Sequence, residues 1–271
     1  MPAVPALTHF SRPQTAEDNP FEVFFRDPVY LEFKNHLYNY LRRREEISRF
    51  VKGVPGLVLE IGSGVSPVVD NPQGNVIYSD MSEEAMKFMR KMRGTHKVLA
   101  MSATEIALGP ETVSAVVCSE VLEHIKEDGK ALSEMARVLK PEGVLILTVP
   151  AHPYYYSYDD RFVGHERRYE VAGLAARLKT LGFEEIEISK VTGLLEKVTM
   201  VAVVLAFRML RLIRKSRGKD SAHPILSIVL PIYKVLNRLY AWIVKWEAKL
   251  MPLPFATIVL IYGRKKVPRI S

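Results

Sequence analysis

The sequence predicts an α/β fold, in which an open and mostly parallel sheet carries a helical insertion before its last strand. Three observations support this prediction. Apolar runs of strand length, such as residues 58–61 and 113–117, alternate with longer segments whose apolar residues recur at helical spacing. A glycine-rich turn follows the first of these runs. A stretch of about 60 helical and basic residues separates the last two predicted strands.

Length and composition fit one globular domain with additions. The chain has 271 residues, of which 48% are hydrophobic and 25% charged, and this allows one large core. Its single cysteine, Cys118, excludes an intramolecular disulfide and a cysteine-based zinc cluster, and we expect it to be small and buried. Residues 1–20 are rich in proline and lack the pattern of a signal peptide. We therefore expect a disordered tail and a cytoplasmic protein.

Residues 21–54 are predicted to form an N-terminal helical cap. The dipeptide Asp27-Pro28 can open a helix, and apolar residues then recur at helical spacing as far as Lys52. The charged cluster at residues 42–46 is expected to be a solvated face of this helix.

The core, residues 55–191, opens with features of a nucleoside-binding half. The first strand runs into Gly62 and Gly64, and the next apolar run, residues 75–80, ends at Asp80. Glycines let the backbone approach a ligand, and an acid at the end of the second strand can accept both ribose hydroxyls.

The nature of the nucleoside follows from two further residues. A dinucleotide site needs a third glycine that opens a helix, whose free N–H groups bind the pyrophosphate. Pro67 stands at that position and has no N–H. Glu60 lies two residues before the first glycine, where it would repel a phosphate and attract an ammonium or sulfonium. These features favour S-adenosylmethionine (SAM).

The remaining core elements continue the alternation. Residues 113–117 are predicted as a strand, 130–139 as a helix, 140–143 as a turn and 144–149 as a strand. A helix at 171–181 and a strand at 184–191 follow, and the final strand is expected at 256–262 within the segment 251–271, which ends in a basic tail.

These segments together resemble a class I SAM-dependent methyltransferase of the small-molecule and quinone-biosynthesis group, over about residues 55–190. The resemblance implies a Rossmann-like sheet of seven strands with the last one antiparallel, SAM as cofactor, and methyl transfer. Three positions depart from the family pattern. The third glycine is replaced near Pro67, the helix between Gly64 and Asp80 must be short or broken, and Ser102 stands where the family often has an acid near adenine.

The resemblance also implies which residues contact the cofactor. Glu60, Gly62 and Gly64 would hold the methionine end, Asp80 the ribose, and Ser102 or its neighbours the adenine. The full predicted set is Glu60, Gly62, Ser63, Gly64, Asp80, Met81, Ser102, Ala103 and Ser119.

Candidate catalytic residues follow the fourth strand, whose end faces the methyl group in this fold. Glu120, Glu123 and His124 would project from one side if Glu120 begins a helix. Neutral His124 could then act as a general base, or the three residues could hold a divalent ion, as a similar arrangement does in ubiquinone-pathway O-methyltransferases. A third interpretation is that Glu123 and His124 only cap the helix.

A polar loop after the fifth strand supplies a further candidate, His165. The run of residues 165–169 could bind an anionic substrate, because arginine pairs well with carboxylate or phosphate. Alternatively, an ion pair between Asp160 and Arg168 could fix the loop. His165 is therefore counted with Glu123 and His124 as a catalytic candidate.

The insertion, residues 192–250, holds eleven Lys or Arg residues and three acids, which accounts for the whole net charge of +8. Its longest run without a charged side chain, residues 221–233, is thirteen residues with two prolines, whereas a spanning helix needs ~20. A basic amphipathic pair of helices with tryptophan favours a position in the membrane surface. A packed helical subdomain or a dimer face remains the alternative.

The sequence therefore predicts an O- or C-methyltransferase for a lipophilic or lipid-linked small molecule, peripherally associated with a membrane. A non-catalytic binding module at the membrane is one alternative. A nucleic-acid methyltransferase is another, disfavoured because the chain outside the insertion is neutral overall. We expect no nucleic-acid partner, and the oligomeric state stays open.

Overall fold

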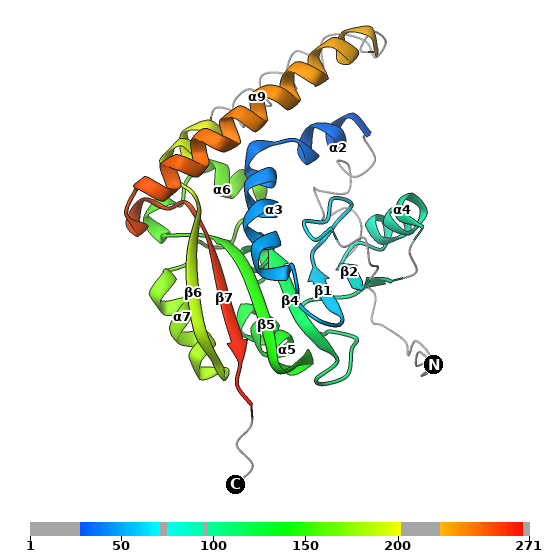
Figure 1. The fold of residues 1–271 in the computed structure, drawn as a ribbon, viewed down its shortest axis with the longest axis vertical. Coiled ribbons are helices and arrows are strands. Elements are labelled where there is room, and N and C mark those ends of the chain that lie inside the picture. The colour runs from blue at the N-terminus through cyan, green and yellow to red at the C-terminus, as the bar shows by residue number, and fades with distance from the viewer. Residues whose placement is uncertain (1–27, 71–74, 95–96, 202–222, 268–271) are drawn as a thin grey trace.

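The computed structural model describes residues 28–70, 75–94, 97–201 and 223–267 (Figure 1). They form one seven-stranded sheet in the order β3-β2-β1-β4-β5-β7-β6. The strands are β1 Val58–Ile61, β2 Val76–Asp80, β3 Val98–Ala100, β4 Val113–Ser119, β5 Leu139–Pro150, β6 Phe183–Thr192 and β7 Ile258–Lys265. The first five strands pair in parallel, and β7 is antiparallel between β5 and β6. The predicted sheet is confirmed.

Helices cover both faces of the sheet, so the central strands are apolar on both sides. Helices α3 (Tyr38–Val51) and α4 (Glu83–Arg93) pack on one face, around a core that includes Ile47, Val58 and Met89. Helices α5 (Asp128–Val138) and α7 (Val171–Thr180) pack on the other, around Leu59 and Leu132. Cys118 is buried at the end of β4, as expected.

The carboxyl ends of β1, β2, β4 and β5 meet at one edge of the sheet. The strand order reverses between β1 and β4, and ligands of open α/β sheets bind in the crevice at such a point. Short elements surround this edge: the 3-10 turn η2 (Leu122–His124), η3 (Pro153–Tyr155), α6 (Tyr158–Val163) and η4 (Leu253–Phe255). Between β1 and β2, the described residues 62–70 form no helix, in line with the short or broken helix expected there.

The N-terminal cap differs from its prediction in two ways. It consists of α2 (Pro28–Asn35) and α3, rather than one helix to Lys52, because Leu37 adopts an extended conformation and the His36 ring bonds to the Glu32 carbonyl at 2.8 Å. The charged cluster is also not a solvated face. Arg42 is 2% exposed and its guanidinium donates to the buried Glu46 carboxylate at 2.7 Å.

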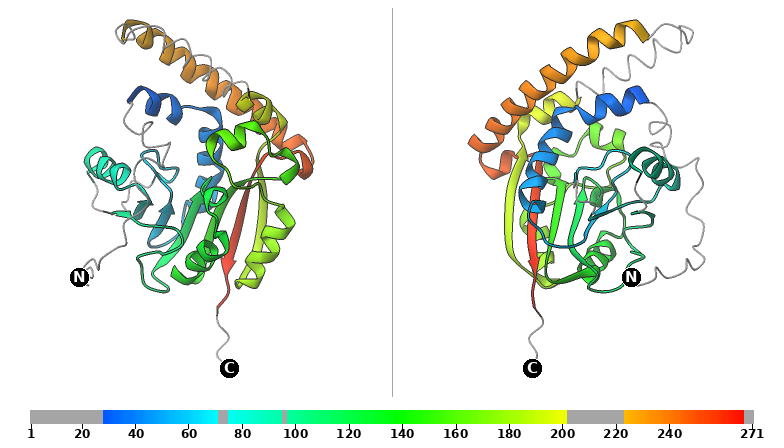
Figure 2. Two further views of the ribbon diagram at one scale, coloured as in Figure 1. Left: turned by 180° about the vertical axis from the view of Figure 1, so that it is seen from behind. Right: turned by 45° about the vertical axis from the view of Figure 1, so that its right-hand side comes forward.

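The insertion leaves the sheet after β6. Residues 194–201 are helical, residues 202–222 lie outside the described part, and α9 (His223–Leu250) returns the chain to β7. Helix α9 packs against α3 and β6 and lies beyond the edge where β1, β4 and β5 end (Figures 1 and 2). Its protein-facing side is built from Ala241, Val244 and Ala248. Among the described helices, none combines the length and apolar character needed to cross a bilayer.

Candidate active site

The glycine turn after β1 has a geometry that requires glycine. Gly62 has a φ of +70°, and an added Cβ would lie 2.2 Å from a methyl group of Val121. The turn therefore presses against the segment that follows β4. The Gly64 N–H donates to Asp80 Oδ2 at 2.9 Å, so the end of β2 is tied to the same turn.

Asp80 lies where the sequence places a ribose acceptor. Its second oxygen accepts from the Ser82 N–H at 2.9 Å, and the neighbouring Met81 is exposed. Burial is the main cause that raises the pKa of Asp80, while the Lys34 ammonium acts against it. Burial in turn lowers the pKa of Lys34 to about 8. Helix α2 thus places a cationic side chain, Lys34, near the predicted ribose acceptor Asp80.

The Glu60 side chain stabilises the loop that follows the glycine turn. Its two carboxylate oxygens accept from the N–H groups of Val68 and Val69 at 2.7 and 2.9 Å. Desolvation raises the pKa of this buried carboxyl to about 7. The observed contacts assign Glu60 to the shape of the glycine loop, and a direct contact with the cofactor stays a prediction.

The other predicted cofactor residues lie along the same edge. The Ser63 N–H donates to the Ser79 carbonyl at 2.9 Å, which fixes the turn on β2. Ser119, at the end of β4, shares a hydrogen bond with Thr148 at 2.8 Å. The Ser102 hydroxyl bonds to Thr104 at 2.8 Å within a local turn after β3, and Ala103 is buried beside it. Contacts of these residues with adenine or methionine remain predictions.

A second group of side chains follows β4 and β5, where the methyl acceptor is predicted to bind. This group, here called the acceptor side, comprises Glu120, Glu123, His124, Asp160 and His165. The condition for the predicted arrangement, that Glu120 begins a helix, is not met. Glu120 has a φ of +54°, and only Leu122–His124 form a single 3-10 turn. The spacing that would stack three side chains on one helix face is therefore lost. The titratable ligand atoms that do converge belong to Glu123, His124 and His165, all within 4.8 Å of one another.

Burial sets the protonation of this group. Glu123 is fully buried, and desolvation followed by repulsion from Glu120 raises its pKa well above its usual range. Burial, and next the nearby His165, lower the pKa of His124 to about 4. The His124 Nδ1–H donates to the Gly164 carbonyl at 3.0 Å, so His124 is neutral and weakly basic.

His165 is held by carboxylates. Its Nδ1 lies 2.9 Å from Asp160 Oδ1, and its Nε2 lies 3.7 Å from Glu123 Oε1. Its ring meets that of His124 edge to face at 4.9 Å. An Nδ1–H that donates to a carboxylate leaves the Nε2 lone pair free to take a proton. Of the two histidines, His165 has the geometry of a general base.

The loop after β5 is fixed by an ion pair, as one of the two interpretations expects. The Arg168 Nε donates to Asp160 Oδ1 at 2.8 Å, and its side chain is 4% exposed. Arg167 lies 3.2 Å from Asp128. Since both guanidinium groups are engaged within the protein, the ion-pair interpretation is favoured over an anionic-substrate site.

This geometry can be compared with known proteins. Residues 59–147 match the family model described as a methyltransferase domain. The chain thus contains a methyltransferase domain of the SAM-dependent kind. SAM is the cofactor of this family, which agrees with the prediction from Glu60, Pro67 and Asp80.

Two curated relatives of this methyltransferase are similar over part of their length. A protein of Mycolicibacterium smegmatis described as a probable S-adenosylmethionine-dependent methyltransferase is 29% identical over 154 residues, 54% of this chain and 60% of that protein. Demethylmenaquinone methyltransferase of Renibacterium salmoninarum is 31% identical over 119 residues, 42% of this chain and 50% of that protein. The chain thus spans only about half of the length of these relatives.

A solved structure agrees in fold. A SAM-dependent methyltransferase from Thermotoga maritima superposes with a TM-score of 0.57 at 18% identity, covering 91% of this chain and all of that one. At this identity the likeness concerns the fold alone.

Four charged residues of this methyltransferase reach the site although sequence reasoning did not select them. Arg43 of α3 donates to the Ser119 hydroxyl at 3.4 Å, and Lys34 faces Asp80. Glu196 and Lys197 come from the insertion. Glu196 is 5% exposed and Lys197 contacts Asp160 at 2.8 Å. A charged pair within the apolar run 194–201 is a signal in the sequence that could have identified the last two.

The acceptor side fits a divalent cation. Both oxygens of Glu123 are buried and lack a hydrogen-bond partner among the described residues. Two imidazoles and one carboxylate suit a transition-metal ion. Glu120 is outside this donor group, so the predicted ligand set of Glu120, Glu123 and His124 changes by exchange of Glu120 for His165.

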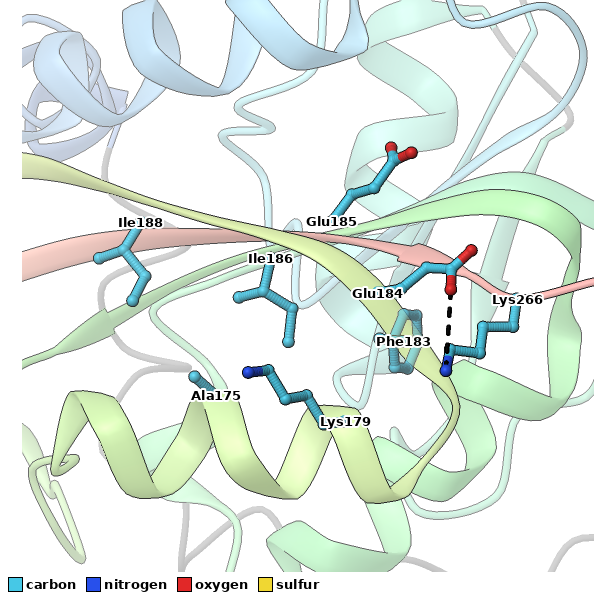
Figure 3. A pocket seen from close by; sticks show the side chains of 8 residues that line it. All are labelled: Ala175, Lys179, Phe183, Glu184, Glu185, Ile186, Ile188 and Lys266. Atoms are coloured by element: carbon cyan, nitrogen blue, oxygen red, sulfur yellow. Dashed lines mark ion pairs between the residues drawn. The ribbon is translucent and has the colours of Figure 1, made fainter.

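Two surface grooves lie at the opposite end of the sheet from these residues. One, of about 470 Å³, runs between α7 and the start of β6 and is bridged at one side by the Glu184–Lys266 ion pair (Figure 3). The other, of about 440 Å³, is lined by residues such as Phe50, Lys140 and Arg264. Both lie near the amino ends of the parallel strands, away from the chemistry.

Proposed function

We propose that this methyltransferase transfers the methyl group of SAM to an oxygen or carbon atom of a lipophilic or lipid-linked small molecule at a membrane surface. The observation that carries the proposal is the row of exposed apolar side chains on α9. This row lies beyond the edge of the sheet that holds the acceptor side.

The row is large and continuous along the helix. Its members are 45 to 80% exposed, whereas the opposite side of α9 is buried: Ile232, Val235, Leu236, Leu239, Trp242, Ile243, Trp246 and Leu250. Leu253 and Phe255 of η4 extend it toward the loop after β5. Monomeric proteins rarely expose such a patch unless it meets a protein, a membrane or a ligand. Tryptophan beside lysine, as in the Lys249–Trp246 contact at 5.0 Å, suits the membrane interface.

The acceptor side supports removal of a proton from the acceptor. SAM, when bound, supplies a methyl group on a sulfonium. His165 Nε2 would take the acceptor proton, and Asp160 would stabilise the resulting imidazolium through Nδ1–H. His124, with its pKa lowered to about 4, is a poor base at neutral pH. Of the two predicted catalytic histidines, we therefore assign the base to His165.

A metal-assisted route is a second candidate, favoured by the buried Glu123 carboxyl group, which has no hydrogen-bond partner among the described residues. Glu123, His124 and His165 would hold the ion. A bound divalent cation would lower the pKa of an acceptor hydroxyl. In that case His165 would serve as a metal ligand and not as a base.

The test is incubation of the full chain with methyl-labelled SAM, anionic vesicles and fractionated cell extract. We expect label in the lipid phase, lost in His165→Ala and Asp160→Asn. Calorimetry should show that these two variants still bind SAM. A chelator that leaves the rate unchanged supports the base, and loss restored by a divalent ion supports the metal. Label that enters only water-soluble products would contradict the lipophilic acceptor.

A further inference from the structure

The first helix of the insertion, residues 194–201, reaches the acceptor side with a charged side chain. The Lys197 ammonium donates to both oxygens of Asp159 and to Asp160 Oδ2, each at 2.8 Å. Lys197 is 14% exposed and Asp160 is 1% exposed, so the pair is shielded from water. Buried, charge-assisted contacts of this length fix geometry more firmly than surface pairs do.

Asp160 is the residue that orients His165. One of its oxygens accepts from Arg168 and faces His165 Nδ1, while the other is bound by Lys197 and the Ser157 N–H. Each carboxylate oxygen of Asp160 is thus held by one cationic side chain, Oδ1 by Arg168 and Oδ2 by Lys197.

Glu196, the residue before Lys197 on the same helix, also faces the acceptor side. It is 5% exposed, and its Oε2 is buried without a hydrogen-bond partner among the described residues. Glu120 and Arg168 lie close enough to act on its charge. Two neighbouring residues of the insertion thus face the acceptor side from one turn of helix.

Helix α9 locks this short helix in place. The Leu195 N–H donates to Glu247 Oε1 at 2.9 Å, and the Tyr240 hydroxyl donates to the Leu195 carbonyl at 3.2 Å. Gly193 passes so close that a Cβ there would lie 2.8 Å from the Glu247 carboxyl carbon. Lys197 is therefore held by its own helix and by α9, and not by the methyltransferase core alone.

We propose that Lys197 is a positioning residue of the active site, which holds Asp160 and through it His165, so that the insertion completes the catalytic centre as well as docking on lipid. This inference rests on the proposed function of His165 as the base. The insertion then has two separable tasks. The outer face of α9 binds the membrane, and the inner helix arranges the proton acceptor.

The experiment compares Lys197→Met with Lys197→Arg and with the matched control Lys190→Met. Lys190 also ties the insertion to the core, through the Lys249 and Met251 carbonyls, but does not touch Asp160. In the label-transfer assay, Lys197→Met should lower kcat about 10- to 100-fold, the cost of a small displacement of a catalytic group. KM for SAM and vesicle binding should be unchanged. Lys197→Arg should restore most of kcat, and Lys190→Met should retain it.

A readout without turnover separates failure of this inference from failure of the proposed function. In the full chain labelled with ¹⁵N at histidine, the His165 Nδ1–H, assigned by its loss in His165→Gln, should resist exchange with water. We expect rapid exchange in Lys197→Met and slow exchange in Lys197→Arg and Lys190→Met. If Lys197→Met does not fold, Lys197→Gln is compared in its place. An unchanged signal and an unchanged kcat in the Met or Gln variant would overturn the inference, whatever the acceptor is.

Discussion

Glu196 offers a test of burial at a single residue. Desolvation raises its pKa from 4.5 to about 7, since its neighbours compensate only in part. An acid with a raised folded-state pKa contributes stability below the unfolded pKa and loses it as pH rises to the folded one. As the pH rises from 5 to 8, ionisation of Glu196 should therefore lower the free energy of unfolding by about 2 to 3 kcal/mol.

The variant Glu196→Gln should remove that pH dependence. Chemical denaturation at pH 5 and pH 8 should show a smaller loss of unfolding free energy than in the unmodified chain, by about 2 kcal/mol. The exposed Glu187→Gln on β6 is the control and should leave the loss unchanged. Equal pH profiles for all three proteins would mean that Glu196 is better solvated than its burial implies.

Gly62 allows a second test at this scale, because Gly53 is a matched control. Both have a positive φ, but an added Cβ at Gly53 meets nothing within 4 Å, whereas at Gly62 it meets Val121. Alanine at either position should cost about 1 kcal/mol through its backbone. Gly62→Ala should lower the free energy of unfolding by a further ~1–3 kcal/mol through overpacking. It should also weaken SAM binding at least about tenfold.

Urea denaturation and calorimetry measure these two effects. Gly53→Ala should bind SAM as the unmodified chain does. If Gly62→Ala binds SAM equally well, the turn at the end of β1 is not part of the cofactor site.

The residues that sequence reasoning identified, and those that it missed, differ in how they reach the site. Gly62, Gly64 and Asp80 lie at the ends of the adjacent strands β1 and β2, so local patterns suffice to predict their neighbourhood. Arg43 and Lys197 come from helices before and after that segment. Their place depends on how those helices pack, and one sequence carries no record of that packing.

At the scale of elements, α9 shows why charge patterning predicted only part of the surface. The sequence predicts a basic stripe on this helix, formed by Lys234, Arg238, Lys245 and Lys249. In the structure Lys234 pairs with Glu32 at 2.5 Å and Lys245 pairs with Glu45, so two stripe members turn toward the protein. The exposed side is mostly apolar, with Arg238 and Lys249 as its exposed stripe members. The helix itself could be predicted from periodicity, but the partners of its lysines lie about 200 residues earlier.

The apolar side of α9 should therefore be required for vesicle binding. Replacing Trp242, which is 61% exposed, by glutamate removes a large interfacial side chain and adds a charge. We expect Trp242→Glu to reduce flotation with anionic vesicles at least about tenfold, with SAM binding unchanged. Met92→Glu on α4, at a side chain that is 68% exposed, is the matched control and should float normally. Loss of flotation in both variants, or in neither, would argue against α9 as the docking face.

At the scale of the whole molecule, the charge of the insertion and the apolar face of α9 contribute to one surface in different ways. The insertion carries all eight excess positive charges of the chain. Each basic side chain near an anionic leaflet adds about 1 kcal/mol, within a screening length of ~8 Å at physiological salt. Apolar burial, at roughly 25 cal/mol per Å², is insensitive to salt. Flotation should need anionic lipid and weaken as salt rises, yet a part should persist at high salt. A chain lacking residues 198–248 should not float; if it floats as well as the intact chain, the insertion only packs on the protein, and a soluble acceptor becomes the better proposal.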